Sequence, residues 1–131
     1  MQADYKKYIL NFKRPSGTSR GVLTTKETWF LKITDGDKVG YGECGILRSL
    51  SIDDWPDYEE KLQWVCNNIN LGETMLWEKL KEFPSIQIGV EMAFRSLKAK
   101  NPFEIFPSEF TDGKAAIPIN GLIWMGEKAF N

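Results

Sequence analysis

The residues best suited to bind a ligand lie in one short stretch rich in glycine and hydroxyl groups. This stretch holds Thr18, Ser19, Arg20 and Gly21, within a Gly-, Pro-, Ser- and Thr-rich segment over residues 14–24. A guanidinium beside hydroxyl groups can bind an anion such as a carboxylate, because its fork donates two parallel hydrogen bonds. An ordinary surface loop with one arginine explains the same residues equally well. The pattern alone therefore leaves both interpretations open.

Three acidic residues form a second candidate, because closely spaced carboxylates can ligate a metal ion. They are Asp53, Asp54 and Asp57. The same segment is typical of a helix start, with Asp54 as the cap and Pro56 in the first turn. Acidic groups at that end of a helix are stabilised by the helix dipole. This structural interpretation is strongly favoured, so no metal site is predicted here.

Groups suited to nucleophilic or general-base catalysis are lacking. The chain has no histidine, which excludes Ser-His-Asp, Cys-His and His-metal sites within it. Cys44 has no partner that would lower the pKa of its thiol. Gly40 and Gly42 alternate along a strand and do not open a helix, so they favour close approach of another backbone over phosphate binding. No catalytic residue and no metal ligand is predicted.

The composition is that of one globular domain with a real core: 131 residues, 42% hydrophobic and 27% charged. The 17 basic and 18 acidic residues nearly cancel, which gives no reason to expect a nucleic acid or a membrane as partner. Two cysteines do not make a disulfide framework, and no signal peptide or membrane-spanning run is seen. A cytoplasmic location is therefore expected.

Three strands in succession should position the candidate residues. Alternating side chains predict strands over residues 5–12, 25–34 and 39–44, with turn residues at 35–38. These strands form an antiparallel meander. Residues 14–24 are then a long, mobile loop between the first two strands, and residues 46–50 begin a second loop.

A layer of three helices is expected after the strands. Apolar spacing predicts helices over residues 58–69 and 73–83, and a third after Pro84 with Ser85 as its cap. The fold class is therefore α+β, a three-stranded antiparallel meander followed by a three-helix layer. A connector at residues 107–114 leads to an apolar run with strand character, residues 117–126.

Several motifs, in their order and spacing, together resemble one enzyme family. They are residues 17–23, GTSRGVL, with Lys26 and Trp29; residues 40–45, GYGECG, and 50–54, LSIDD; residues 84–93, PSIQIGVEMA; and residues 117–126, IPINGLIWMG. The chain is similar in these motifs to enolase-superfamily enzymes of the muconate-lactonizing type. Within that group it most resembles the o-succinylbenzoate synthase family.

The resemblance implies a capping domain over residues 1–114, and the first strand of a truncated TIM barrel over residues 115–131. It implies a lyase of menaquinone biosynthesis that dehydrates a cyclohexadiene hydroxy acid to o-succinylbenzoate. In this family, lysines act as acid and base on a proton alpha to a carboxylate, and a divalent metal, here expected to be Mg²⁺, stabilises the enediolate. Those lysines and metal ligands would belong to the missing barrel. The 131-residue chain alone would lack the catalytic residues and bind no metal.

The resemblance also implies a lid over the barrel mouth, built from a first loop at residues 18–23 and a second loop at residues 46–50. Arg20 would contact a substrate carboxylate or orient the lid. The substrate-binding residues expected on this basis are Thr18, Ser19, Arg20, Gly21, Leu47, Leu50, Asn120 and Trp124. The implied partners are a small-molecule carboxylate substrate and the missing C-terminal barrel, and a homo-oligomer is compatible with the sequence.

Two alternatives stay open. A dipeptide epimerase or N-acylamino-acid racemase of the same superfamily would share the cap. A stand-alone, non-catalytic binding domain would instead bury residues 117–124 against its own helices. The capping interpretation predicts that this apolar tail lies exposed or is held by another chain.

Overall fold

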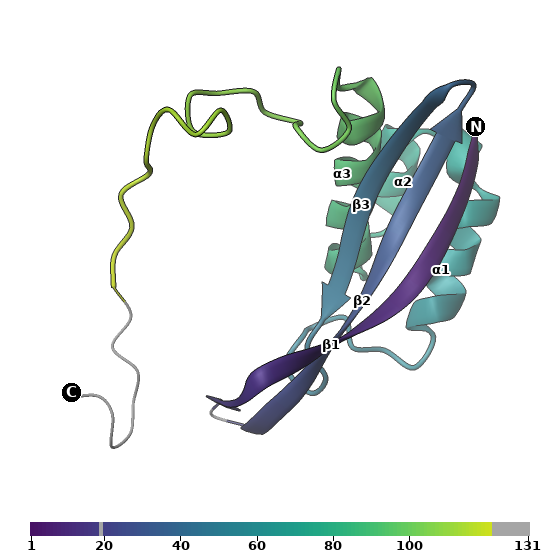
Figure 1. The fold of residues 1–131 in the computed structure, drawn as a ribbon. Helices are drawn as coiled ribbons and strands as arrows, with labels where there is room; N and C mark the ends of the chain where they lie inside the picture. Colours follow the sequence, from purple (N-terminus) through teal and green to yellow (C-terminus); the bar gives the residue numbers. More distant parts are fainter. Residues whose placement is uncertain (19, 122–131) are drawn as a thin grey trace.

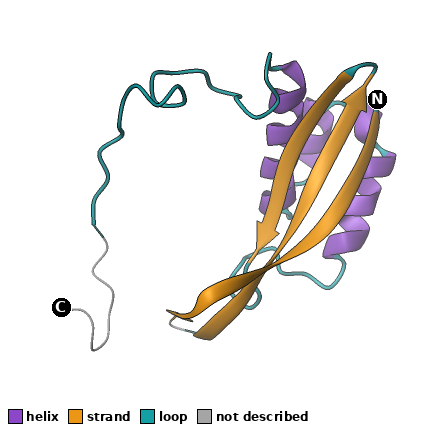
Figure 2. Cartoon of the chain, in the orientation of Figure 1, coloured by secondary structure: helices purple, strands orange, loops and turns teal. Residues whose placement is uncertain are grey.

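The chain folds into two layers, a twisted sheet and a set of helices on one of its faces (Figure 1, Figure 2). The computed structural model describes residues 1–18 and 20–121. Strands β1 (Gln2–Thr18), β2 (Gly21–Asp35) and β3 (Lys38–Ile46) form an antiparallel sheet in the order β1-β2-β3. Helices α1 (Tyr58–Asn67), α2 (Glu73–Lys79) and α3 (Pro84–Lys98) follow, with a 3₁₀ turn, η1 (Ile69–Leu71), between the first two. The predicted meander and helical layer are confirmed.

The first two strands are much longer than the sequence predicted. They pair from Gln2 opposite Thr34 to Asn11 opposite Thr25, and after a register shift they pair again over residues 16–18 and 21–23. The predicted long loop over residues 14–24 is therefore wrong, because most of it is a β-hairpin. Its Gly, Pro and Ser content is typical of loops, but the irregularity between Asn11 and Ser16 accommodates Pro15 and lets pairing resume.

The core lies between the sheet and the helices. Along β2, Trp29, Leu31 and Ile33 alternate toward the helices and are fully buried. Trp29 packs against Tyr58 at the start of α1, with 4.7 Å between the ring centroids. The other buried apolar side chains of this cluster are Cys44, Ile46, Leu62, Val65, Cys66, Ile69, Leu76, Leu80, Phe83, Ile86, Val90, Ala93, Phe94 and Leu97.

Glycines bring α3 directly against β3. A Cβ atom added to Gly42 would lie 1.9 Å from the carbonyl oxygen of Gly89, and one added to Gly40 would lie 2.2 Å from that of Ala93. Only residues without a side chain allow two backbones to approach so closely. The prediction that the alternating glycines admit another backbone is confirmed for Gly40 and Gly42, whereas Gly45 lies against the side chains of Lys26 and Thr28.

The sheet face that turns away from the helices carries exposed aromatic side chains. Tyr8 and Phe30 are 51% and 44% exposed, and their ring centroids lie 6.2 Å apart. At the β3 edge, Phe103 stacks on Tyr41 with 5.2 Å between centroids. The apolar residues Tyr8 and Leu10 of the first strand thus point away from the core, whereas Lys7 reaches the ring of Trp29 on the helical side.

The helix starts differ from the sequence prediction in which residues cap them. Helix α1 begins at Tyr58 after Asp57, and Asp54 lies in the preceding turn and does not cap it. Helix α3 begins at Pro84, and Ser85 does not cap it through its own side chain. Instead, Asp53 accepts hydrogen bonds from the Ser85 backbone N–H (2.8 Å) and hydroxyl (2.6 Å). Asp53, 32 positions earlier in the sequence, thus accepts a hydrogen bond from a backbone N–H in the first turn of α3 that has no partner within the helix.

Residues 99–121 form no helix or strand. Phe103 and Phe106 still contact Tyr41 and Arg95, and the described chain after them leads away from the two layers (Figure 1). Ile117 and Ile119 are 57% and 88% exposed. Residues 117–121 of the predicted apolar strand pair with no strand among residues 1–18 and 20–121, and the rest of that segment lies outside the described residues. In the described part of the chain, no helix has the length and apolar character needed to cross a bilayer.

Candidate functional site

Two segments predicted to form a lid meet at one end of the sheet. The hairpin tip, residues 16–23, joins β1 to β2, and the second loop, residues 47–54, follows β3. The guanidinium Nη1 of Arg20, in the tip, donates a hydrogen bond of 2.9 Å to the carbonyl oxygen of Ser49, in the second loop. The structure therefore brings the two segments into direct contact, although 29 residues separate these positions in sequence.

Within the hairpin tip, a threonine hydroxyl closes the turn. Thr18 Oγ1 donates to the Gly21 carbonyl (2.8 Å) and accepts from the Arg20 backbone N–H (3.2 Å). Gly21 has a φ of 132°, a conformation that side chains rarely allow. The turn is thus held by local contacts, which leave the Arg20 guanidinium available for the second loop.

The second loop is a tight turn stabilised by its own backbone. The Leu47 carbonyl accepts from the N–H groups of Leu50 (3.0 Å) and Ser51 (2.9 Å), and the Leu47 N–H donates to Ser51 Oγ (2.9 Å). Ser49 has a φ of 65°, an uncommon conformation for a residue with a side chain. Leu47 and Leu50 are both half-buried.

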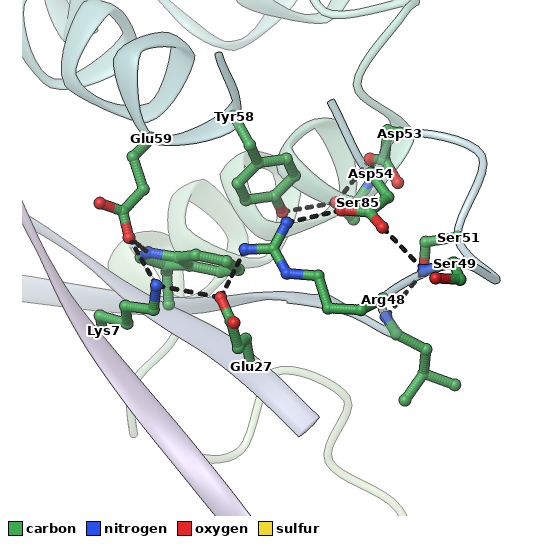
Figure 3. A network of polar contacts seen from close by, with 12 residues as sticks. Lys7, Glu27, Arg48, Ser49, Ser51, Asp53, Asp54, Tyr58, Glu59 and Ser85 are labelled. Carbon is green, nitrogen blue, oxygen red and sulfur yellow. Dashed lines mark hydrogen bonds and ion pairs between the residues drawn. The ribbon is translucent and has the colours of Figure 1, made fainter. Parts of the chain in front are cut away.

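A chain of charged side chains supports the second loop from the helical side of the sheet, as Figure 3 shows. Arg48 pairs with Glu27 of β2 (2.6 Å) and with Asp54 (2.5 Å). Lys7 of β1 pairs with the same Glu27 (3.0 Å) and with Glu59 of α1 (3.1 Å). We call Lys7, Glu27, Arg48, Asp54 and Glu59 the charged network.

Trp29 lies beneath this network and contacts both of its cations. Its indole Nε1 donates to Glu59 (2.8 Å), while Lys7 Nζ and Arg48 Cζ lie 5.0 Å and 6.0 Å from its ring. A buried aromatic face attracts such cations and fixes where they lie. The loop contacts are thus connected to the core of the domain.

The three carboxyl groups of the charged network have lowered pKa values. The hydrogen bond from Arg48 is the main cause of the lowered pKa of Glu27, and the backbone N–H of Ser49 is the main cause for Asp54. The indole of Trp29 lowers the pKa of Glu59. Each carboxylate is therefore stabilised in its charged form by a donor aimed at it.

A second, buried polar cluster joins the base of the second loop to α3 (Figure 3). Asp53 is 2% exposed and accepts the two hydrogen bonds from Ser85 described above. The Tyr58 hydroxyl lies 2.6 Å from Ser85 Oγ, and burial raises the pKa of Tyr58. The sequence favoured a place for these acidic residues in the first turn of the helix, but α1 begins only at Tyr58. Asp53 and Asp54 precede it and accept hydrogen bonds from Ser85, Arg48 and Ser49 instead.

The structure places part of the predicted substrate-binding set together. Thr18, Arg20 and Gly21 lie in the hairpin tip beside the loop that carries Leu47 and Leu50. Asn120 lies in the extended C-terminal segment, where its side chain donates to the Gly121 carbonyl (3.3 Å). Ser19 and Trp124 lie outside the described residues.

Sequence reasoning missed Arg48 and Glu27, which shape the second loop, and it gave Asp54 the different role of a helix cap. The one usable signal for Arg48 was that it is a charged residue within the predicted second loop, residues 46–50. Its partner Glu27 is 21 residues away, a separation that no local pattern reports.

The described residues offer no site for the divalent metal implied by the sequence motifs. Among residues 1–18 and 20–121, no three His, Cys, Asp or Glu side chains are grouped closely enough to hold a metal ion. Burial raises the pKa of the Cys44 thiol to about 12, so it is not a nucleophile at neutral pH. What the described residues of the hairpin tip offer chemically is the Arg20 guanidinium and the Thr18 hydroxyl.

No protein-family model matches the chain. A curated o-succinylbenzoate synthase from Desulfotalea psychrophila is 32% identical over 161 aligned residues, which cover 99% of this chain and 44% of that protein. The crystal structure of MenC from the same organism superposes with a TM-score of 0.76 at 27% identity, over 99% of this chain and 43% of that one. The predicted resemblance to o-succinylbenzoate synthase is confirmed. The chain spans less than half the length of these relatives.

Two more distant structures share the fold. An o-succinylbenzoate synthase from Thermosynechococcus elongatus, complexed with Mg in its active site, has a TM-score of 0.60 at 19% identity, over 76% of this chain and 31% of that one. An enolase family member from Agrobacterium tumefaciens with homology to dipeptide epimerases has a TM-score of 0.57 at 20% identity, over 78% of this chain and 32% of that one. At these identities the likeness concerns the fold alone.

Proposed function

We propose that this chain is the capping portion of an o-succinylbenzoate synthase. In this proposal the hairpin tip and the second loop cover an active site that the remainder of a longer protein provides. The match to a curated synthase supports the proposal. It covers 99% of this chain but only 44% of the synthase, as expected if this chain corresponds to one portion of such an enzyme. The reaction is dehydration of a cyclohexadiene hydroxy acid to o-succinylbenzoate, in the cytoplasm.

The contribution of this chain is to shape and close the pocket. A lid excludes water, which strengthens the electrostatic stabilisation of charge that develops on the substrate. Arg20 is the residue proposed to face a substrate carboxylate or to orient the lid, with Thr18 and Gly21 forming its turn. We assign no catalytic residue to the chain. The Mg²⁺ and the lysines that serve as acid and base belong, in this proposal, to the segment that the chain lacks.

The exposed apolar tail favours this proposal over a stand-alone binding domain. An isolated domain would bury Ile117 and Ile119 against its own helices, but both side chains are exposed. We propose that residues 115–131 contribute the first barrel strand, with Asn120 and Trp124 lining the pocket. The domain boundary at residue 114 is part of the same proposal.

A dipeptide epimerase is the second candidate. The Agrobacterium structure supports it through the shared fold, but at 20% identity against 32% for the synthase. The synthase is therefore the first choice.

A chimera tests the proposal. It joins this chain to the part of the Desulfotalea synthase that the match does not cover, and it is assayed with Mg²⁺ for dehydration and, separately, for dipeptide epimerisation. We expect dehydration by the chimera and none by the 131-residue chain alone. Dehydration by the chain alone would contradict our placement of the catalytic groups, and a folded chimera without dehydration activity would contradict the proposed function.

A further inference from the structure

Both polar backbone groups of Ser49 are bound by side chains from outside its own turn. Its N–H donates to Asp54 Oδ2 (2.7 Å), and its carbonyl accepts from Arg20 Nη1 (2.9 Å). A residue with φ near 65° has a conformational cost, and it keeps this conformation only where its surroundings hold it. Ser49 is thus the one described point at which a contact from the hairpin tip and a contact from the charged network converge.

Arg48 binds Asp54, the side chain that accepts from the Ser49 N–H. Its two terminal nitrogens divide between Asp54 (2.5 Å) and Glu27 (2.6 Å), so the guanidinium bridges the second loop to β2. Glu27 is held in turn by Lys7, which adds β1 to the same chain of contacts. A planar fork can serve two carboxylates at fixed angles, which a lysine ammonium on a flexible stem cannot do as well.

We propose that Arg48 is a positioning residue that couples the hairpin tip to the second loop. Arg48 holds the Asp54 carboxylate in place, and this carboxylate holds the backbone N–H of Ser49. The orientation of the Ser49 peptide in turn presents its carbonyl oxygen to Arg20. The two halves of the lid therefore open and close together. The role as a lid rests on the proposed function, whereas the coupling itself is a property of this chain.

The coupling predicts a reciprocal effect of substitutions at its two ends. If opening of one segment favours opening of the other, then weakening either end must loosen both to a similar degree. A residue that only stabilised the domain would instead speed opening everywhere, or only near itself. Arg95 provides a matched control, because it is also 46% exposed and pairs with Glu91 at 2.6 Å, but on α3, away from both loops.

The test is amide hydrogen exchange, followed by NMR, on the 131-residue chain and its variants Arg48→Lys, Arg20→Lys and Arg95→Lys. We expect Arg48→Lys to speed exchange about fivefold at residues 49–51 and also at residues 20–23. Arg20→Lys should speed exchange at the same two sets of residues. Exchange in the double variant, Arg48→Lys with Arg20→Lys, should be little faster than in either single variant. Arg95→Lys should leave the exchange rates of both sets unchanged.

Faster exchange at residues 49–51 alone in Arg48→Lys would overturn the coupling, as would unchanged exchange in both sets. An equal effect of Arg95→Lys would also overturn it, because the loosening would then be general. The experiment needs neither substrate nor barrel, so its failure leaves the proposed function standing. Failure of the chimera, conversely, leaves this coupling standing.

Discussion

The α3–β3 contact and the loop end of the sheet hold their parts together in opposite ways. Where α3 crosses β3, the backbones meet at Gly42 and Gly89 with no room for another carbon atom. At the loop end, exposed segments are joined by long charged side chains such as Arg20 and Arg48. The first kind of contact tolerates no change, whereas the second can be lost while the backbone stays folded. The packed region thus fixes the fold, whereas the contacts of the loop end can change without loss of the fold.

The largest expected effect comes from filling the packed contact. Gly42→Ala places a Cβ 1.9 Å from a backbone oxygen, so α3 must move away from β3. We expect the free energy of unfolding, measured by urea denaturation, to fall by about 3 kcal/mol.

Gly17→Ala is the matched control, because Gly17 also lies in a strand but a Cβ there meets no atom within 4 Å. It should change the free energy of unfolding by less than about 0.5 kcal/mol. Similar losses in the two variants would contradict the distinction between the packed contact and the loop end.

An intermediate effect is expected at the buried polar cluster. Asp53→Ala leaves the N–H and hydroxyl of Ser85 without this acceptor at a half-buried position, which should cost about 2 kcal/mol of unfolding free energy. Asp57→Ala should cost about 0.5 kcal/mol or less, because Asp57 is exposed and its side chain makes no cap hydrogen bond. If thermal denaturation found Asp57→Ala as damaging as Asp53→Ala, the cap supplied by Asp53 would be refuted.

The smallest effect is expected from the charged network, and it should depend on pH. Glu27→Gln removes the charge that pairs with Lys7 and Arg48, which should cost about 1 kcal/mol at pH 7. The pKa of Glu27 is lowered in the folded chain, so its stabilisation is present above the ordinary value of 4.5 and is lost as the pH falls through the lowered value.

The difference in unfolding free energy between the original chain and Glu27→Gln should therefore shrink when urea denaturation is repeated near pH 3. Glu91→Gln, on the exposed face of α3, serves as the comparison and should cost about 0.5 kcal/mol at pH 7. A difference for Glu27→Gln that grew on acidification would show that the network does not favour the charged carboxylate.

The packed region was largely predictable from sequence, for a local reason. Alternation in β2 marked Trp29, Leu31 and Ile33, and the spacing in α3 marked Ile86, Val90 and Ala93, because each pattern is set by the period of its own element. The alternating glycines of β3 correctly predicted a close backbone approach.

The loop end was harder to predict because its contacts join distant positions. The composition of residues 14–24 is typical of a loop, yet residues 16–18 pair with residues 21–23 once a register shift has accommodated Pro15. Asp53 caps α3 from 32 residues earlier in the sequence, and Glu27 binds Arg48 from 21 residues earlier. Contacts between positions so far apart leave no periodic pattern in the sequence. The family resemblance pointed to both segments and to Arg20, but not to its acceptor Ser49 or to the contacts of Arg48 with Glu27 and Asp54.

The most direct measurement of the lid role compares two arginine variants of the chimera. We expect Arg20→Ala to lower kcat/KM for dehydration at least tenfold, because it loses both the contact to Ser49 and the cation proposed to meet the substrate. Arg95→Ala, which breaks an ion pair on α3, should leave kcat/KM unchanged. Equal values for the two variants would contradict the claim that this end of the sheet covers the site of reaction.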